Sequence, residues 1–205
     1  SGADVVIQHI SSGVSIDLIR TYKKLGAKLH AEATPHHFSL TEDAVLEHGT
    51  LAKMNPPLRN KDDQEALLAG LLDGTIDMIA TDHAPHSAEE KAKGLRGSAM
   101  GVVGIETAFP LLYTYLVETG KMPLEMLIDR MADAPRRRFR IDGGMQVGDK
   151  AAVTVFDLHA QEKIDPNTFL SKGRATPFEG WKVHAACRLT ICGDKIAYNA
   201  LSRKE

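Results

Sequence analysis

Three features that mark specialised classes of protein are scarce or missing in this sequence. It has only two cysteines, Cys187 and Cys192, in 205 residues, which excludes a small secreted fold held together by disulfides. No run of about 18 apolar residues, the length needed to cross a bilayer, occurs in it. Residues 1–10 lack the charged head and apolar body of a secretory signal. We therefore expect a cytoplasmic protein with no membrane partner.

An excess of charge of either sign is also lacking. The 25 basic residues nearly balance 27 acidic ones, which gives a formal net charge of -2 and no electrostatic reason to expect a nucleic-acid partner. The one basic cluster comprises Arg136, Arg137, Arg138 and Arg140. It is more typical of a solvated helix end or a domain contact than of a polyanion site. The hydrophobic content of 43% is enough to bury a core in one or two domains.

Strand-like and helix-like segments alternate in the first two thirds of the chain. Strand patterns occupy residues 3–11, 27–35 and 76–86, and helix patterns occupy residues 15–26, 60–74, 105–120 and 122–135. In the first helix pattern the spacing predicts one apolar face made of Ile16, Ile19, Tyr22 and Leu25. This alternation favours an α/β fold, a parallel sheet or barrel, over residues 1–141.

The pattern changes at about residue 142. Residues 147–158 and 182–199 alternate in the period of a β-strand, and Gly193 and Asp194 mark a hairpin turn. We expect residues 142–205 to form a small β-sandwich module.

Three successive predicted strands end in residues that can bind a metal. These are His9 after the first, Glu32, His36 and His37 after the second, and Asp82, His83 and His86 after the third. One histidine at such a position is more often an ordinary core or loop residue, but three strand ends in a row favour a site at the catalytic face of an α/β barrel. Imidazole and carboxylate suit Zn²⁺, and Asp82 is suited both to bind the metal and to move a proton.

Several strings in the sequence together resemble one family. They are "EATPHHFSLTED" (32–43), "KMNPPLR" (53–59), "TDHAPH" (81–86), "GIETAFPLL" (104–112) and "FLSKGRATPFEGW" (169–181). In this order they resemble the long, bacterial type of dihydroorotase in the amidohydrolase superfamily, over nearly the whole chain. Hydantoinases and allantoinases share the architecture but differ at the "PHH" and at the second histidine of "DHAPH".

The resemblance implies a reaction and a set of metal ligands. Dihydroorotases reversibly cyclise N-carbamoyl-L-aspartate to L-dihydroorotate in de novo pyrimidine biosynthesis, with one or two zinc ions per protein. His9 matches the last histidine ligand, on the sixth barrel strand. Asp82 matches the aspartate of the eighth strand, which binds zinc and acts as the general acid and base. Glu32 matches a glutamate that binds an additional zinc in some relatives, although support of His36 or the strand end is the favoured role.

The resemblance also implies residues that bind the substrate. Asn55 and His86 match residues that contact dihydroorotate or carbamoyl aspartate, and Gly101 lies in the loop, residues 98–104, whose backbone closes over the pyrimidine ring. His36 and His37 are expected to support the site from behind.

One departure from the family limits these expectations. Family members begin with a strand that carries "HxH" and later supply a bridging carboxylate, Asp or carbamylated Lys, and neither segment is present. The chain is therefore expected to be the C-terminal part of a TIM barrel, about strands 6 to 8, completed by the missing N-terminal half or by homo-oligomer formation. Alone it is expected to be inactive.

Two alternatives to a dihydroorotase remain open. One is another cyclic amidohydrolase, a hydantoinase or an allantoinase. The other is a non-catalytic dihydroorotase-like subunit that serves as a scaffold for aspartate transcarbamoylase. Such subunits typically lose zinc ligands, and this chain keeps both of those that it can contain, His9 and Asp82, which favours an enzyme.

Overall fold

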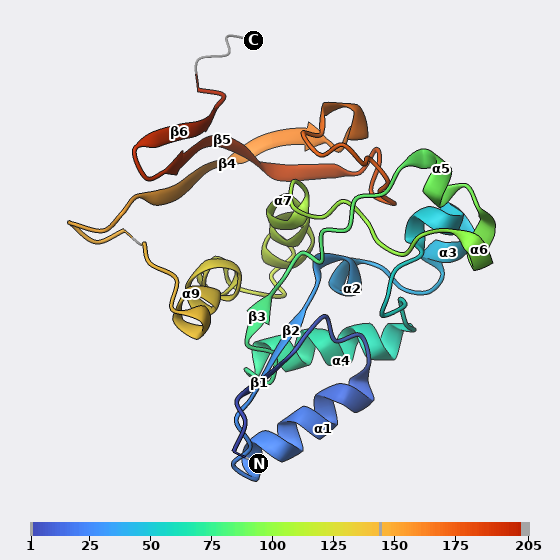
Figure 1. Ribbon diagram of the computed structural model, residues 1–205, viewed down its shortest axis with the longest axis horizontal. Coiled ribbons are helices and arrows are strands. Elements are labelled where there is room, and N and C mark those ends of the chain that lie inside the picture. Colours follow the sequence, from blue (N-terminus) through green and yellow to red (C-terminus); the bar gives the residue numbers. More distant parts are fainter. Residues whose placement is uncertain (1, 144, 202–205) are drawn as a thin grey trace.

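The computed structural model describes residues 2–143 and 145–201. A parallel sheet lies near the N-terminus, with the strands β1 (Val5–Ile7), β2 (Leu29–Ala33) and β3 (Met78–Ile79) side by side in that order (Figure 1). The helices α1 (Gly13–Lys24) and α4 (Lys61–Leu72) connect successive strands and lie next to each other. The predicted order of strands and helices is confirmed, and the fold class is α/β.

Side chains in the loops fix where both connecting helices begin. Ser12 accepts a hydrogen bond from the backbone N–H of Ser15, and Asn60 accepts one from that of Asp63, which satisfies donors that the helix itself leaves free. Gly70 allows the two helices to approach closely, because a Cβ atom at this position would lie 3.0 Å from the side chain of Ile16.

The predicted apolar face of α1 is only partly buried. Ile16 and Ile19 are buried, but Tyr22 is 52% exposed, and Leu25, which follows the last helical residue, is 75% exposed. The reason is the position of the helix. It packs against α4 and β2, and only the side of the helix that faces these elements is covered.

The remaining helices are short. They are α2 (Pro35–Ser39), α3 (Ala44–His48), the 3-10 turn η1 (Gly49–Ala52), α5 (Ala88–Lys91), α6 (Gly94–Gly97), α7 (Ala108–Leu112), the π-helical turn η2 (Tyr113–Val117), α8 (Leu124–Ile128), the π-helical turn η3 (Asp129–Asp133), α9 (Ala134–Phe139) and the 3-10 turn η4 (Pro166–Thr168). No helix in the described part of the chain is long and apolar enough to cross a membrane.

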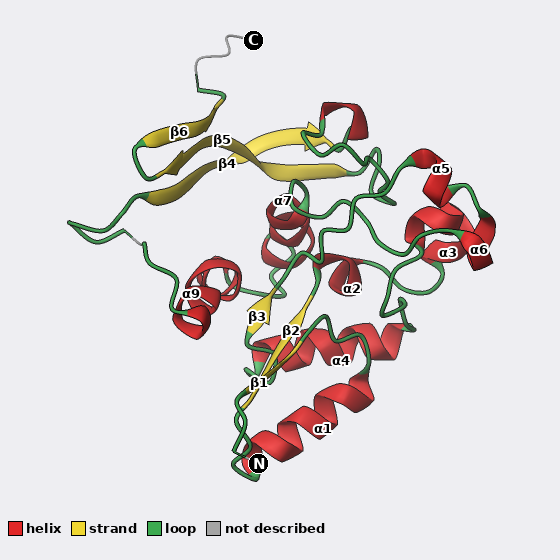
Figure 2. Ribbon diagram, in the orientation of Figure 1, coloured by secondary structure: helices red, strands yellow, loops and turns green. Residues whose placement is uncertain are grey.

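The C-terminal segment forms an antiparallel sheet. Its strands are β4 (Ala152–Lys163), β5 (Lys182–Cys192) and β6 (Lys195–Asn199), and the two-residue turn between β5 and β6 is the predicted one at Gly193 and Asp194 (Figure 2).

The described residues of this segment contain one sheet, and the β-sandwich module stays a prediction. The sheet packs on α7 and η2 instead of on a second sheet, and the ring of Phe156 stacks on that of Phe109 with 4.0 Å between their centroids. A helix thus buries the apolar face that a second sheet would cover in a sandwich. The boundary at residues 141 and 142 stays a prediction.

Candidate functional site

The carboxyl ends of the three parallel strands bring the predicted metal ligands together. The N–H of Ile10 donates to the carbonyl of Glu32 (2.8 Å), and the N–H of Ala80 donates to that of Ala33 (3.1 Å), so the strands end at the same level. His9, Glu32 and Asp82 therefore lie at one edge of the sheet, as the sequence predicts. The charges of His9 and Asp82 both act on the carboxyl group of Glu32.

His9 and Asp82 share an unusual backbone conformation. Their φ angles are 39° and 46°, in the left-handed region that residues other than glycine seldom adopt. Only two other non-glycine residues of the described chain, Arg140 and Ala185, have positive φ. Such strain costs free energy and persists only where the surrounding fold fixes the backbone. It concentrates at functional sites, where a side chain must be held in one direction. The turn after each strand thus aims these two side chains.

His9, Glu32 and Asp82 do not form a metal site by themselves. Within residues 2–143 and 145–201, no three His, Cys, Asp or Glu side chains lie close enough together to hold a metal ion. Burial raises the pKa of Glu32, and the charge of Asp82 raises it further, while His9 lowers it. Nδ1 of His9 is buried and finds no hydrogen-bond partner among the described residues. His9 and Asp82 offer an imidazole and a carboxylate, the donor types that suit Zn²⁺.

His36 and His37 lie behind these residues, at the start of α2. Both are 2% exposed, and burial lowers the pKa of His36 well below 6.5 and that of His37 to about 4, so both imidazoles are neutral at pH 7. The Pro56 carbonyl can only accept, so Nε2 of His37 donates to it (3.0 Å) and Nδ1 accepts from the hydroxyl of Thr34 (2.7 Å). His37 thereby holds the segment that carries Asn55, which is exposed.

His86 and Gly101, two predicted substrate-binding residues, are in contact through one loop. Nε2 of His86 donates to the carbonyl of Met100 (2.9 Å). The N–H of Gly101 donates to the carbonyl of Lys53 (3.0 Å), which ties this loop to the segment with Asn55. Gly101 has a φ of 137°, and a Cβ atom there would lie 2.4 Å from that of Ala84, so only glycine fits.

His83, a predicted candidate ligand, and Lys91, which was not predicted, both bind the loop of Gly101. Nδ1 of His83 accepts from the N–H of Gly104 (3.1 Å) and fixes the far end of the loop. Lys91 is 3% exposed, and its ammonium donates to the carbonyls of Ala99 and Gly101 in the same loop. No signal in the sequence could have found Lys91, since "SAEEKAKG" (87–94) reads as a solvated helix.

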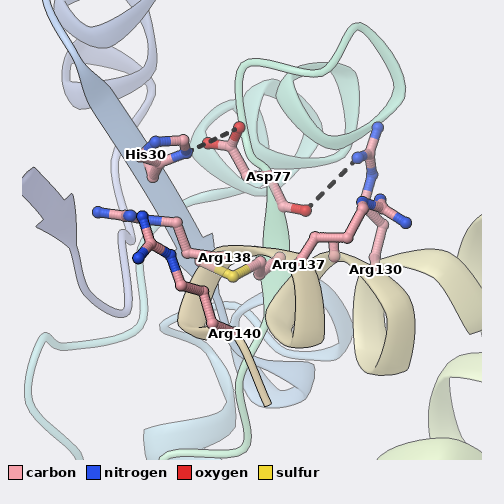
Figure 3. Close-up of a pocket in the computed structure, with 8 residues that line it drawn as sticks. His30, Asp77, Arg130, Arg137, Arg138 and Arg140 are labelled. Carbon is pink, nitrogen blue, oxygen red and sulfur yellow. Dashed lines mark hydrogen bonds and ion pairs between the residues drawn. The ribbon is translucent and has the colours of Figure 1, made fainter. Parts of the chain in front are cut away.

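A cavity of about 370 Å³ lies away from these residues, at the amino-terminal ends of the strands (Figure 3). Its lining includes four arginines and two partners from the sheet, namely Arg130, Arg137, Arg138, Arg140, His30 and Asp77. Arg138 pairs with Asp4 (2.7 Å), and Arg136 donates to the carbonyl of Ala152 (3.2 Å) at the start of the second sheet. The arginine cluster thus joins parts of the fold, in agreement with the interpretation as a contact patch.

Comparison with known proteins identifies relatives of the chain. No protein-family model matches it. Over 199 residues, 97% of its length, it is 49% identical to a dihydroorotase of Anoxybacillus flavithermus, and over 191 residues, 93% of its length, it is 52% identical to one of Bacillus cereus. The chain is homologous to part of the dihydroorotases.

The chain spans about half the length of these dihydroorotases, 46% and 45% respectively. Among solved structures it resembles an L-hydantoinase (dihydropyrimidinase) from Arthrobacter aurescens, with a TM-score of 0.90 and 29% identity over 97% of this chain and 46% of that one. The fold is therefore that of a part of these amidohydrolases, while the sequence is nearer to the dihydroorotases than to this hydantoinase.

Proposed function

We propose that this chain is the C-terminal part of a dihydroorotase, which reversibly cyclises N-carbamoyl-L-aspartate to L-dihydroorotate. The identity of about half of the residues to dihydroorotases carries this proposal. The placement of His9 and Asp82 at the carboxyl ends of the two outer strands, on either side of β2, and their strained backbones support it independently.

Asp82 is the proposed general acid and base. In the hydrolytic direction water adds to the ring amide carbon, the carbon–nitrogen bond breaks, and the leaving nitrogen requires a proton. The carboxylate of Asp82 takes a proton from the attacking water and gives it to that nitrogen. A carboxylate held by a strained turn stays in one orientation for both transfers.

His9 and Asp82 are the proposed zinc ligands of this chain, and Glu32 is a further candidate. Bound Zn²⁺ supplies Lewis-acid polarisation of the amide and lowers the pKa of water. The remaining ligands would come from the part of a dihydroorotase that this chain does not span. Glu32 is 9% exposed and next to His9, which supports a role in orienting that imidazole.

Asn55, His86 and Gly101 are the proposed substrate-binding residues. The loop of Gly101 and the segment of Asn55 are joined by a hydrogen bond, and His86 donates to the same loop. A small anionic ring compound bound between them would meet an amide, an imidazole and backbone groups, which suits dihydroorotate.

The complete protein is proposed to be a cytoplasmic TIM-barrel enzyme of de novo pyrimidine biosynthesis, either with its N-terminal half or as a homo-oligomer. A hydantoinase activity is the alternative that the structural likeness supports. A scaffold for aspartate transcarbamoylase is the non-catalytic alternative. Neither a membrane nor nucleic acid is a proposed partner.

The test is to reconstitute the site. The chain is expressed alone and together with the part of a homologous dihydroorotase that it does not span, and each preparation is assayed with zinc on L-dihydroorotate, hydantoin and allantoin. We expect turnover of dihydroorotate only after reconstitution, and a loss of about 1,000-fold in Asp82→Asn. Asp157→Asn, at the distant antiparallel sheet, is the matched control. Preference for hydantoin or allantoin, or activity that survives in Asp82→Asn, would overturn the proposal.

A further inference from the structure

The ammonium group of Lys91 is buried and binds three main-chain carbonyls. It donates to the carbonyls of Lys53 (3.1 Å), Ala99 (3.1 Å) and Gly101 (2.9 Å), so each of its three N–H groups has an acceptor. Lysine is seldom this deeply buried, at 3% exposure, unless its charge is compensated. The position therefore has a specific requirement for a cation.

Side-chain donors take four successive carbonyls of the same loop. Lys53 donates to the carbonyl of Ser98 (2.6 Å), Lys91 to those of Ala99 and Gly101, and His86 to that of Met100. Loop carbonyls usually face water, so this arrangement fixes the direction of each peptide group from residue 98 to residue 101. Lys91 holds two of the four and also joins the loop to residue 53.

The charge of Lys91 is compensated by these carbonyl dipoles. No carboxylate of the described residues pairs with its ammonium. Burial, with a smaller contribution from Lys53, lowers the pKa of Lys91 to about 8, so the cationic form still predominates at pH 7. Because each carbonyl presents only a partial charge, the cation is held only while all three point at it. The shape of the loop and the burial of Lys91 therefore depend on each other.

We propose that Lys91 is a positioning residue that fixes the loop of residues 98–104 in the shape that receives the substrate. The proposal rests on the proposed function, in which Gly101 and His86 contact dihydroorotate. Lys91 itself does not touch the reacting atoms. It acts through Gly101, whose backbone it binds directly, and through the adjoining Met100 carbonyl that His86 holds.

The first test measures hydrogen exchange of the 205-residue chain by mass spectrometry. Lys91→Met keeps the length of the side chain but removes the three donors, and Lys93→Met changes an exposed lysine of the next turn. The N–H groups of Ala99, Gly101 and Val103 are hydrogen bonded, to the carbonyls of Glu90, Lys53 and Ala175. We expect exchange in peptides of residues 98–103 to become at least about tenfold faster in Lys91→Met, with α4 unchanged.

The second test uses the reconstituted dihydroorotase. Because the loop contacts the substrate and not the scissile bond, we expect Lys91→Met to raise KM for dihydroorotate about tenfold and to change kcat less than about threefold. Lys93→Met should change neither constant. If Lys91→Met does not fold, Lys91→Gln, which keeps a shorter donor, should show both effects in weaker form.

The outcomes separate this proposal from the proposed function. Unchanged exchange at residues 98–103, or faster exchange everywhere including α4, would refute a local role of Lys91. Faster local exchange with an unchanged KM would show that the loop does not position substrate. Absence of all dihydroorotase activity after reconstitution would count against the proposed function, while the exchange experiment would still decide whether Lys91 fixes the loop.

Discussion

The two ends of the parallel sheet differ in how their polar side chains are paired. At the amino-terminal end charges meet opposite charges, as in the pairs of Lys23 with Asp77 (2.6 Å) and of Arg138 with Asp4 (2.7 Å). At the carboxyl end imidazoles are buried and neutral, and polar atoms are left without partners among the described residues. These atoms are Nδ1 of His9, Nε2 of His36 and Oγ of Ser98.

This difference in pairing indicates which end of the sheet is the better candidate for a functional site. Buried polar atoms without partners cost free energy, so a fold keeps them where a ligand or a reaction uses them. Two guanidinium Nε atoms, of Arg130 and Arg138, are also unpartnered at the amino end, but Nη1 of Arg130 and both Nη atoms of Arg138 bind oxygens. The amino-terminal end therefore stabilises the fold, and the carboxyl end holds strained and unpaired groups.

The largest effect on stability is expected from His37, at the carboxyl end. Its pKa in the folded chain is about 4, below its ordinary value of 6.5, so between these pH values the unfolded chain binds more protons. This contribution to the free energy of unfolding is complete above pH 6.5 and falls by about 3 kcal/mol as the pH drops through 4. Denaturant titrations of wild type and His37→Gln across this range measure it. We expect His37→Gln to weaken the pH dependence of the free energy of unfolding between pH 6.5 and 4, and the exposed control His159→Gln to leave it unchanged. The reverse result would contradict the assignment.

A smaller effect is expected from Asp77, at the amino-terminal end. Its carboxylate accepts hydrogen bonds from Lys23 and from the backbone N–H of Ala31 (2.8 Å), so Asp77→Ala leaves a donor of β2 unsatisfied. We expect a loss of about 2 kcal/mol in the free energy of unfolding, with dihydroorotase activity after reconstitution within about threefold of wild type. Glu65→Ala, on the exposed side of α4, should cost less than about 0.5 kcal/mol. Loss of activity in a folded Asp77→Ala protein would contradict the view that the amino-terminal end of the sheet serves only to stabilise the fold.

The smallest effect is expected from Arg138. Its guanidinium binds both carboxylate oxygens of Asp4 and ties the start of β1 to α9, but the pair is partly exposed. Arg138→Gln should cost about 1 kcal/mol or less at low salt, and the difference from wild type should shrink as salt is raised. Arg96→Gln, an exposed arginine of α6, provides the baseline. A salt-independent cost several times larger would mean that the arginine cluster does more than join parts of the fold.

Much of the fold and part of the site could be predicted from the sequence, because both follow from periodicity and position. Alternating segments predicted the strand order, and the residues after each strand predicted that His9, Glu32 and Asp82 lie together. The exposure of Tyr22 and Leu25 could not be predicted, since periodicity reports a helical face but not whether another element covers it.

The sequence by itself determined the α/β fold, the two-residue turn at Gly193 and the family relationship, because these depend on local pattern and on residue identity. Only the tertiary structure decided the strained backbones of His9 and Asp82, the neutral state of His37 and the burial of Lys91. These properties depend on what lies across space from each residue. Lys91 lies in a charged run of the sequence. It can be buried and hold the loop only because the carbonyls of residues 53, 99 and 101 accept hydrogen bonds from its ammonium.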